Sequence, residues 1–132
     1  MAKQKQPRRL EQTETRAVLK SAKSSPQKAR LVMELIKGKS VEKALAELTF
    51  STKAISREVK TLLESAIANA ENNHGLNVDE LYVKTAFADK SFVMKRFRAR
   101  ARGRAAKILK PRSHLTVVVA ERPEPTTAKT GE

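Results

Sequence analysis

The sequence predicts one small domain that combines helices with strands and carries a strongly basic segment toward its C-terminal end. Its 132 residues leave room for a single modest core. Apolar residues recur at helical spacing before Gly75 and with a period of two after it, which indicates helices followed by strands. The thirty residues from Ser91 to Ala120 contain nine Lys or Arg and no Asp or Glu, whereas residues 13–90 contribute only +3 to the total net charge of +14. The simplest interpretation is a near-neutral body with charged appendages.

A short strand and a well-delimited helix are predicted in the first forty residues. Residues 16–21 (RAVLKS) fit a strand. Ser25 suits the N-cap of the following helix, and Pro26 suits its first position, where a missing N–H costs nothing. Gly38 is expected in a left-handed conformation just past the end of this helix. The apolar stripe of the helix consists of Ala29, Val32, Met33 and Ile36.

Two further helices are predicted before Gly75. One begins at Ser40, and the other begins near Ser51 or Thr52 and runs to about Asn73. The longer helix has the most regular apolar stripe in the chain, and the sequence Asn-Asn-His-Gly ends it. The two stripes are Val41, Ala44, Leu45 and Leu48, and then Ile55, Val59, Leu62, Leu63, Ala66, Ile67 and Ala70.

Two strands are predicted after Gly75, on either side of the basic segment. Residues 81–87 alternate and predict a half-buried strand, and residues 114–120 predict another. If both continue into the basic segment as an antiparallel pair, each arm within residues 88–113 has about 12 residues and spans roughly 40 Å at ~3.3 Å per residue. Such a hairpin needs a partner, because an isolated hairpin is marginal in water. The inward set of the first strand is expected to be Leu81, Val83, Thr85 and Phe87.

The basic segment predicts a nucleic-acid partner. Five arginines fall on every second position, so a strand would place all five guanidinium groups on one face. Like charges at this density repel one another and require a dense polyanion to neutralise them, and nucleic acid supplies phosphates at that density. These residues are Arg96, Arg98, Arg100, Arg102 and Arg104.

Local periodicity leaves two questions open in this segment. Arg96, Arg100, Arg104 and Lys107 would also share one face of a helix, and the alanines between them favour a helix. Strand and helix are therefore equally compatible with the pattern. The apolar residues within the segment either stack on unpaired bases or pack on one another across a hairpin, and both are compatible with the sequence. These apolar residues are Phe92, Val93, Met94 and Phe97.

Nothing in the sequence indicates an enzyme, a cofactor or a metal site. There is no Cys, and the two histidines, His74 and His114, have no second ligand at suitable spacing. The acids are dispersed along helix faces instead of forming a catalytic pair, and no Gly-rich phosphate loop or nucleophile motif occurs. Residues 1–13 are expected to form a disordered basic arm without the apolar region of a secretory signal. The longest apolar run is too short to cross a bilayer.

Three segments resemble the bacterial large-subunit ribosomal protein twenty-two family. They are residues 25–39 (SPQKARLVMELIKGK), residues 67–73 (IANAENN) and residues 94–115, where MKR is followed by RARGRAAKILK and SHL. The resemblance covers roughly residues 14–121 and is specific because the segments occur in this order and spacing. It implies an α+β fold, with three helices packed on a small antiparallel sheet and a long β-hairpin projecting at about residues 88–113. Residues 122–132 lie outside the resemblance and are expected to form a flexible tail.

The resemblance also implies a function and partners. Members of this family are structural constituents of the large subunit in the cytoplasmic ribosome. The hairpin threads between segments of ribosomal RNA, and its tip helps line the nascent-peptide exit tunnel near the macrolide site. The expected partners are large-subunit ribosomal RNA, neighbouring ribosomal proteins and, near the tip, nascent peptide and macrolides. The chain is thus expected to support subunit assembly and translation, with no enzyme activity, cofactor, membrane or homo-oligomer.

Site residues are expected by position in the family's motifs. Residues 94–96 fall on the MKR segment and are expected at the hairpin tip, lining the tunnel. Lys28 and Arg30, which fall on the helix-start motif, are also expected to bind RNA, as are Lys95 and Arg96. Arg8 and Arg9 are expected to bind RNA as part of the basic arm, outside the resemblance. The tip residues are Met94, Lys95 and Arg96, and the RNA-facing return arm contains Arg98, Arg100, Arg102, Arg104, Lys107, Lys110 and Arg112.

The sequence departs from the family's usual pattern near the tip, and two other classes of protein share some of its features. Ser91-Phe92 stand where Gly-Pro is common in the family, and Ala99 stands where a Pro is common. Because these prolines are absent, the backbone path of the tip is less constrained than in other members. A DNA-architectural protein also uses arginine-bearing β-arms, and it would be an obligate dimer that bends duplex DNA. A membrane-active protein is disfavoured because the basic segment has no wide apolar face.

Overall fold

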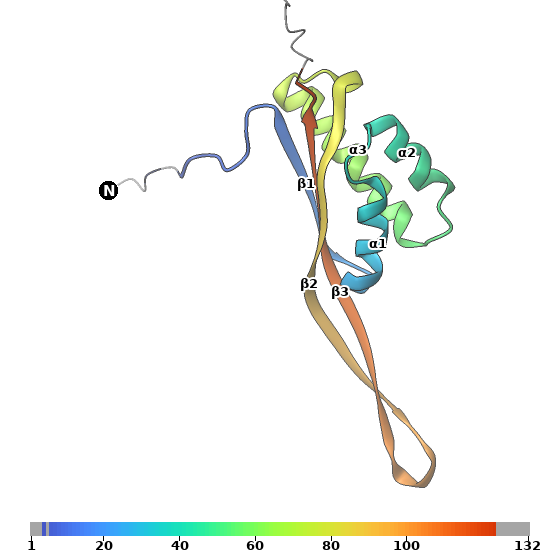
Figure 1. Ribbon diagram of the computed structural model, residues 1–132. Helices are drawn as coiled ribbons and strands as arrows, with labels where there is room; N and C mark the ends of the chain where they lie inside the picture. Colours follow the sequence, from blue (N-terminus) through green and yellow to red (C-terminus); the bar gives the residue numbers. More distant parts are fainter. Residues whose placement is uncertain (1–3, 5, 124–132) are drawn as a thin grey trace, which may run out of the picture.

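The computed structural model describes residue 4 and residues 6–123, and it confirms the expected α+β fold (Figure 1). Three antiparallel strands form one sheet in the order β1-β3-β2, so the last strand lies in the centre. The predicted tail lies outside the described residues from residue 124 onward, and the described part of the basic arm contains no helix or strand. The elements are β1 (Glu14–Ala22), α1 (Pro26–Ile36), α2 (Val41–Phe50), α3 (Ile55–His74), the short 3-10 turn η1 (Val78–Glu80), β2 (Leu81–Ala99), the 3-10 turn η2 (Ala101–Gly103) and β3 (Ala105–Glu121).

Helix α1 begins and ends as its sequence predicts. The Ser25 hydroxyl accepts a hydrogen bond from the backbone N–H of Lys28, and Pro26 occupies the first helical position. Gly38 follows the helix with φ of +79°, and its N–H donates to the carbonyl of Val83 at 2.8 Å. This bond ties the end of α1 to strand β2.

Helix α3 begins three to four residues later than predicted. Ser51 does not cap it, because the Ser51 hydroxyl instead accepts a bond from the Ser56 hydroxyl at 2.8 Å and from the N–H of Lys53. A polar turn therefore precedes the helix, which starts at Ile55. The end is as predicted, since Gly75 is left-handed at φ of +60°.

The core lies between the three helices and one face of the sheet. Helix α3 packs against β1 and helix α1 packs against β2, on the same side of the sheet (Figure 1). The central strand contributes Leu115, Val117 and Val119, whose side chains are fully buried, and the predicted helix stripes face them. The largest fully buried helical side chains are Met33, Ile36, Leu63, Val32 and Val59.

Strand β2 does not keep the alternation that its sequence predicts. Val83 pairs with Val119 and Thr85 pairs with Val118, so Lys84 is an extra residue in a β-bulge. The bulge reverses the faces that follow it, because side chains alternate with a period of two. Phe87 is consequently 43% exposed, and the prediction that it lies on the buried face is wrong. The buried positions beyond the bulge are Ala86 and Ala88.

Strands β2 and β3 continue past the body as a paired hairpin, which resolves the choice between strand and helix. We call residues 91–112 the hairpin arm. A register shift between Lys90 and Val93 marks its base, and regular pairing then continues to Ala99 opposite Ala105. No side chain within residues 91–112 is fully buried, whereas Ser113, at the base of the arm, is fully buried. The nine residues from 91 to 99 span roughly 30 Å at ~3.3 Å per residue, and the arm projects away from the helices (Figure 1).

The turn of the hairpin lies at residues 100–104, not at the MKR segment. The N–H of Arg100 donates to the carbonyl of Arg104 at 2.7 Å, and Arg102 and Gly103 both have positive φ. Met94 pairs with Lys110 within the strands. The prediction that residues 94–96 form the tip is therefore wrong in position, because the motif marks a stretch of strand and the left-handed pair at 102–103 makes the turn.

Candidate nucleic-acid interface

The hairpin arm carries cations on both of its faces. Directly opposed residues of an antiparallel pair point to the same side, so the register assigns each side chain to a face. One face carries Lys95 and Lys107, and the other carries Arg96, Arg98 and Lys110. All five side chains are exposed, and the arm contains no Asp or Glu. The ribbon therefore presents positive charge in two opposite directions.

The turn adds a third group of cations. Arg100, Arg102 and Arg104 are all exposed, and Arg102 has left-handed backbone geometry at φ of +62°. The predicted single row of five guanidinium groups is thus wrong, because strand β2 ends at Ala99 and three of the five arginines belong to the turn. The charge surrounds the end of the arm instead of lining one side.

Apolar side chains lie open among these cations. Phe97 is 79% exposed and Leu109 is 58% exposed, although the two share a face of the arm. Packing across the hairpin therefore does not bury them. Val93 and Met94, nearer the base, are partly covered. The exposed ring of Phe97 is available to stack on an unpaired base, which is one of the two roles that its sequence allows.

The base of the arm and the start of α1 together form a basic hollow of about 410 Å³. Three of its cations, Lys28, Lys110 and Arg112, are predicted RNA-binding residues, and the sequence analysis missed a fourth, Lys23. Met94 also lines this hollow, which places it at the base of the arm beside the body. The full lining is Lys23, Ser24, Ser25, Lys28, Met94, Lys110, Pro111 and Arg112.

Arg30 has a partner within the chain. Its Nε donates to the backbone carbonyl of Ala88 at 3.4 Å, which joins α1 to β2 just before the arm begins. Its side chain is otherwise exposed. Arg30 thus helps orient the hairpin relative to the helices, and its predicted RNA contact stays a prediction.

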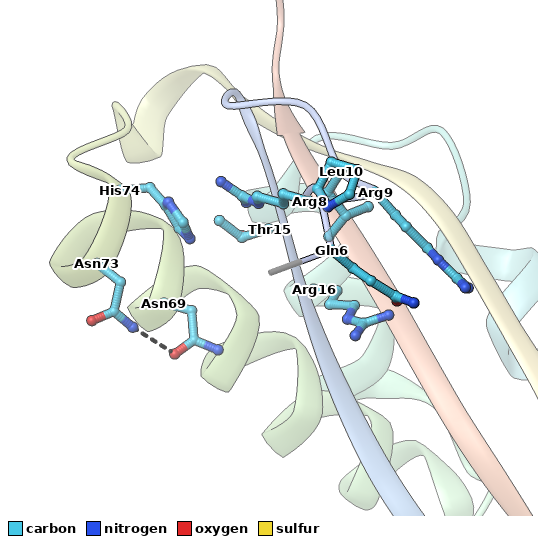
Figure 2. Close-up of a pocket in the computed structure, with 10 residues that line it drawn as sticks. Gln6, Arg8, Arg9, Leu10, Thr15, Arg16, Asn69, Asn73 and His74 are labelled. Atoms are coloured by element: carbon cyan, nitrogen blue, oxygen red, sulfur yellow. Dashed lines mark hydrogen bonds between the residues drawn. The ribbon is translucent and has the colours of Figure 1, made fainter. Parts of the chain in front are cut away.

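Arg8 and Arg9 line a second hollow, which lies along β1 (Figure 2). This groove has a volume of about 610 Å³ and lies between the N-terminal segment and the end of α3. The guanidinium of Arg8 donates to the backbone carbonyl of Glu14 at 2.5 Å, which holds the segment against β1. The lining is Gln6, Pro7, Arg8, Arg9, Leu10, Thr15, Arg16, Asn69, Asn73 and His74. Sequence reasoning missed Arg16, Asn69, Asn73 and His74 as members of one site.

Two acids, Glu11 and Glu14, directly adjoin the groove lining in sequence, and both line a different hollow. Glu14 is buried, and its carboxylate forms an ion pair with Lys84 of strand β2. The hydrogen bond from Lys84 to this carboxylate raises the pKa of the Lys84 ammonium above its ordinary value. The Glu14 side chain does not line the groove, and its ion pair with Lys84 offsets its charge.

The described residues offer no catalytic or metal-binding constellation. Across residue 4 and residues 6–123, no group of three or more His, Cys, Asp or Glu lies close enough together to hold a metal ion. His114 is occupied by the fold, because its Nδ1 accepts a hydrogen bond from the N–H of Ser21 at 3.1 Å. Over the same residues, every helix is too short or too polar to cross a membrane.

A compact α+β body with a long cationic ribbon and no catalytic constellation is typical of a ribosomal protein, a class whose role is structural. Comparison with known proteins identifies the family. The sequence model of ribosomal protein L22p/L17e matches residues 17–120. The chain belongs to this family, as the resemblance of its motifs predicts, and the family consists of structural proteins, not enzymes.

Individual relatives match over nearly their whole length. The chain is 63% identical over 121 residues to large ribosomal subunit protein uL22 of Maricaulis maris, covering 92% of this chain and 96% of the relative. It is 60% identical over 121 residues to the uL22 of Methylobacterium radiotolerans, covering 92% and 94%. It is 58% identical over 124 residues to that of Rhodospirillum rubrum, covering 94% and 98%. The similarity therefore includes both the body and the hairpin arm.

Proposed function

We propose that this chain is a structural constituent of the large subunit of the cytoplasmic ribosome and that its hairpin arm threads between segments of ribosomal RNA. The observation that carries the proposal is the placement of cations on both faces of the arm and around its turn. A partner that approaches from one side would leave the opposite face unneutralised. A partner that surrounds the arm neutralises all of it, and folded RNA provides phosphates on every side.

The energetics of the free arm support this assignment. The nine cations within residues 91–112 repel one another, and no acid lies among them. Beyond the base of the arm, which lies beside the start of α1, the two strands pair only with each other. A two-stranded ribbon of this kind is marginal in water. Phosphate contacts remove the repulsion and fix the ribbon, so the arm gains most of its order from its partner.

The relatives support the assignment to the large subunit. Each is a large ribosomal subunit protein by name, and each aligns with this chain over 92% or more of its length. The partners of the chain would then be large-subunit ribosomal RNA and neighbouring proteins of that subunit. The chain acts as a monomer within the subunit and supports assembly and translation.

We further propose that the far part of the arm helps line the nascent-peptide exit tunnel, where nascent peptide and macrolides would contact it. The resemblance of residues 94–96 to the MKR segment supports a role for Lys95 and Arg96, which are exposed. The position of the turn extends this role to residues 100–104, which project furthest from the body (Figure 1). Met94, in the hollow at the base, would then contact RNA and not the tunnel.

The test is incorporation of the tagged full-length chain into ribosomal particles separated by sedimentation. The wild-type chain is expected in the large-subunit fraction. Replacing Arg100, Arg102 and Arg104 with Ala should reduce that incorporation, because RNA packed around the turn loses three neutralising charges. A control that replaces Lys43 and Arg57, exposed on helices α2 and α3, should incorporate normally. A chain that sediments with DNA, or not with ribosomal particles at all, would contradict the proposal.

A further inference from the structure

We propose that the groove along β1 is a second RNA-binding site, which holds a nucleotide of an unpaired RNA segment distinct from the RNA around the hairpin arm. The inference deepens the proposed function and rests on it for the class of partner. It is carried by Arg8, Arg16 and two asparagine amides, which line one concave surface, whereas the Arg9 side chain extends away from the asparagines (Figure 2). The groove combines groups that bind phosphate with groups that recognise a base edge.

The arginines supply the phosphate-binding part. Arg8, Arg9 and Arg16 line the groove, and each is exposed. The bond from Arg8 to the Glu14 carbonyl uses one of the five N–H donors of the guanidinium and leaves the others for a ligand. The guanidinium is thus held in place before RNA arrives, and a planar fork of donors suits phosphate oxygens.

The end of helix α3 beside the groove does not cancel this attraction. A helix C-terminus carries roughly half of a negative charge, which opposes an anion. The two full guanidinium charges of Arg8 and Arg16 outweigh it. Glu71 lies between Asn69 and Asn73 in sequence, but two residues along a helix turn by about 200°, so it lies on the opposite face of α3. It does not line the groove.

The asparagines supply the part that recognises a base. Asn73 Nδ2 donates to Asn69 Oδ1 at 3.2 Å, which fixes both amide planes (Figure 2). This bond leaves the two amide N–H donors of Asn69 and the amide oxygen of Asn73 unused. The free amide donors of Asn69 match the acceptor atoms on the edge of an unpaired base. A volume of about 610 Å³ accommodates a nucleotide, since ligand pockets measure ~300–1,000 Å³.

The groove is separate from the hairpin arm, so the two sites act independently. Thr15, on its floor, pairs with Val119, and the arm ends at Arg112 on the same strand. Seven residues of strand at ~3.3 Å each place them roughly 23 Å apart. That distance exceeds the Debye length of about 8 Å at physiological ionic strength. The chain would therefore join two RNA segments at a fixed separation across its rigid sheet.

The first test removes the groove charges in the full-length chain. Binding to large-subunit ribosomal RNA transcribed in vitro is measured over a series of salt concentrations for Arg8→Gln/Arg16→Gln. Loss of two phosphate contacts should lower the slope of log K against log salt by about 1.4–1.8, at ~0.7–0.9 per contact. Arg8→Lys/Arg16→Lys should restore the slope, because it restores the charge. The matched control Lys43→Gln/Arg57→Gln, which removes two exposed charges outside the groove, should leave the slope unchanged.

The second test separates base recognition from charge. Asn69→Ala/Asn73→Ala should weaken binding several-fold at every salt concentration without changing the slope, because amides carry no charge. An unchanged slope for the Arg8/Arg16 glutamine variant overturns the second site. Unchanged affinity for the asparagine variant overturns the assignment of a nucleotide base to it.

A third variant distinguishes failure of this inference from failure of the proposed function. Alanines at Arg100, Arg102 and Arg104 remove charge from the turn of the arm only. If the turn variant lowers the slope and the groove variant does not, the inference is wrong and the role of the arm stands. If only the groove variant lowers the slope, the groove binds RNA and the proposed role of the arm is wrong. Additive losses in a combined variant support both sites.

Discussion

RNA that surrounds the hairpin arm should contact both faces and the turn, and salt dependence can count those contacts group by group. Three variants divide the exposed cations as the register does. The first replaces both lysines of one face with Ala, the second replaces the three cations of the opposite face, and the third replaces the three arginines of the turn. The groups are Lys95 and Lys107, then Arg96, Arg98 and Lys110, then Arg100, Arg102 and Arg104.

The expected magnitudes follow from the number of cations in each group. If each neutralises one phosphate, the slope of log K against log salt falls by ~0.7–0.9 per cation. The first variant should lose about 1.4–1.8, and the other two about 2.1–2.7 each. Because all eight side chains are exposed and none forms an ion pair with another described residue, the fold of the body should not change.

The assay is equilibrium binding of each full-length variant to large-subunit ribosomal RNA at several salt concentrations. Thermal unfolding of each variant provides the control, since an unchanged midpoint shows that only the interface was altered. RNA on both faces requires all three variants to lower the slope. If either face variant leaves the slope unchanged, RNA lies against one side only, and the reasoning from a surrounded ribbon is refuted.

Three further predictions follow from the separation of body and arm. Leu63→Ala, in the fully buried core, should lower the free energy of unfolding by about 2–5 kcal/mol in urea titrations. Leu109→Ala, on the exposed arm, should change it by less than about 1 kcal/mol, and similar losses in the two variants would contradict the separation of body and arm. Hydrogen exchange should show strong protection in α3 and little in residues 91–112 without RNA, and equal protection in both would refute a marginal free arm. Deletion of residues 94–96 removes an odd number of residues from β2 and so inverts the faces beyond it. Because Lys95 and Arg96 are also lost from the arm, incorporation into the large subunit should fall, and sedimentation that shows normal assembly would contradict RNA contact on both faces.

Local sequence rules predicted much of the body correctly. The Ser25-Pro26 start of α1 and the left-handed glycines that follow α1 and α3 depend on hydrogen bonds and steric freedom within a few residues. The helix stripes face the core as predicted because their spacing alone defines a face, although Leu45 and Ile67 are only partly buried. Ser51 failed as a cap because a hydroxyl that can cap a helix can equally stabilise the turn before it.

Features that depend on strand register were beyond prediction from local pattern. The bulge at Lys84 reverses the faces of β2, and no periodicity in the sequence marks it. The turn lies at Arg102-Gly103, where alternation of arginines suggested continuous strand. The groove was missed for a related reason: Arg8, Arg16 and Asn69 are distant in sequence, and the packing of α3 beside β1 brings them together. The only local sign of that groove was the basic N-terminal segment.

The most direct test of the central claim compares two exposed phenylalanines by hydroxyl-radical footprinting of the full-length chain, free and bound to large-subunit ribosomal RNA. Phe97 on the arm is 79% exposed and Phe50 at the end of α2 is 85% exposed, so both should be oxidised readily in the free chain. In the complex, RNA around the arm should protect Phe97 strongly, while Phe50, outside the arm, should keep its reactivity. If Phe97 is oxidised in the complex as fast as in the free chain, the arm is not enclosed by RNA, and the proposed function is contradicted.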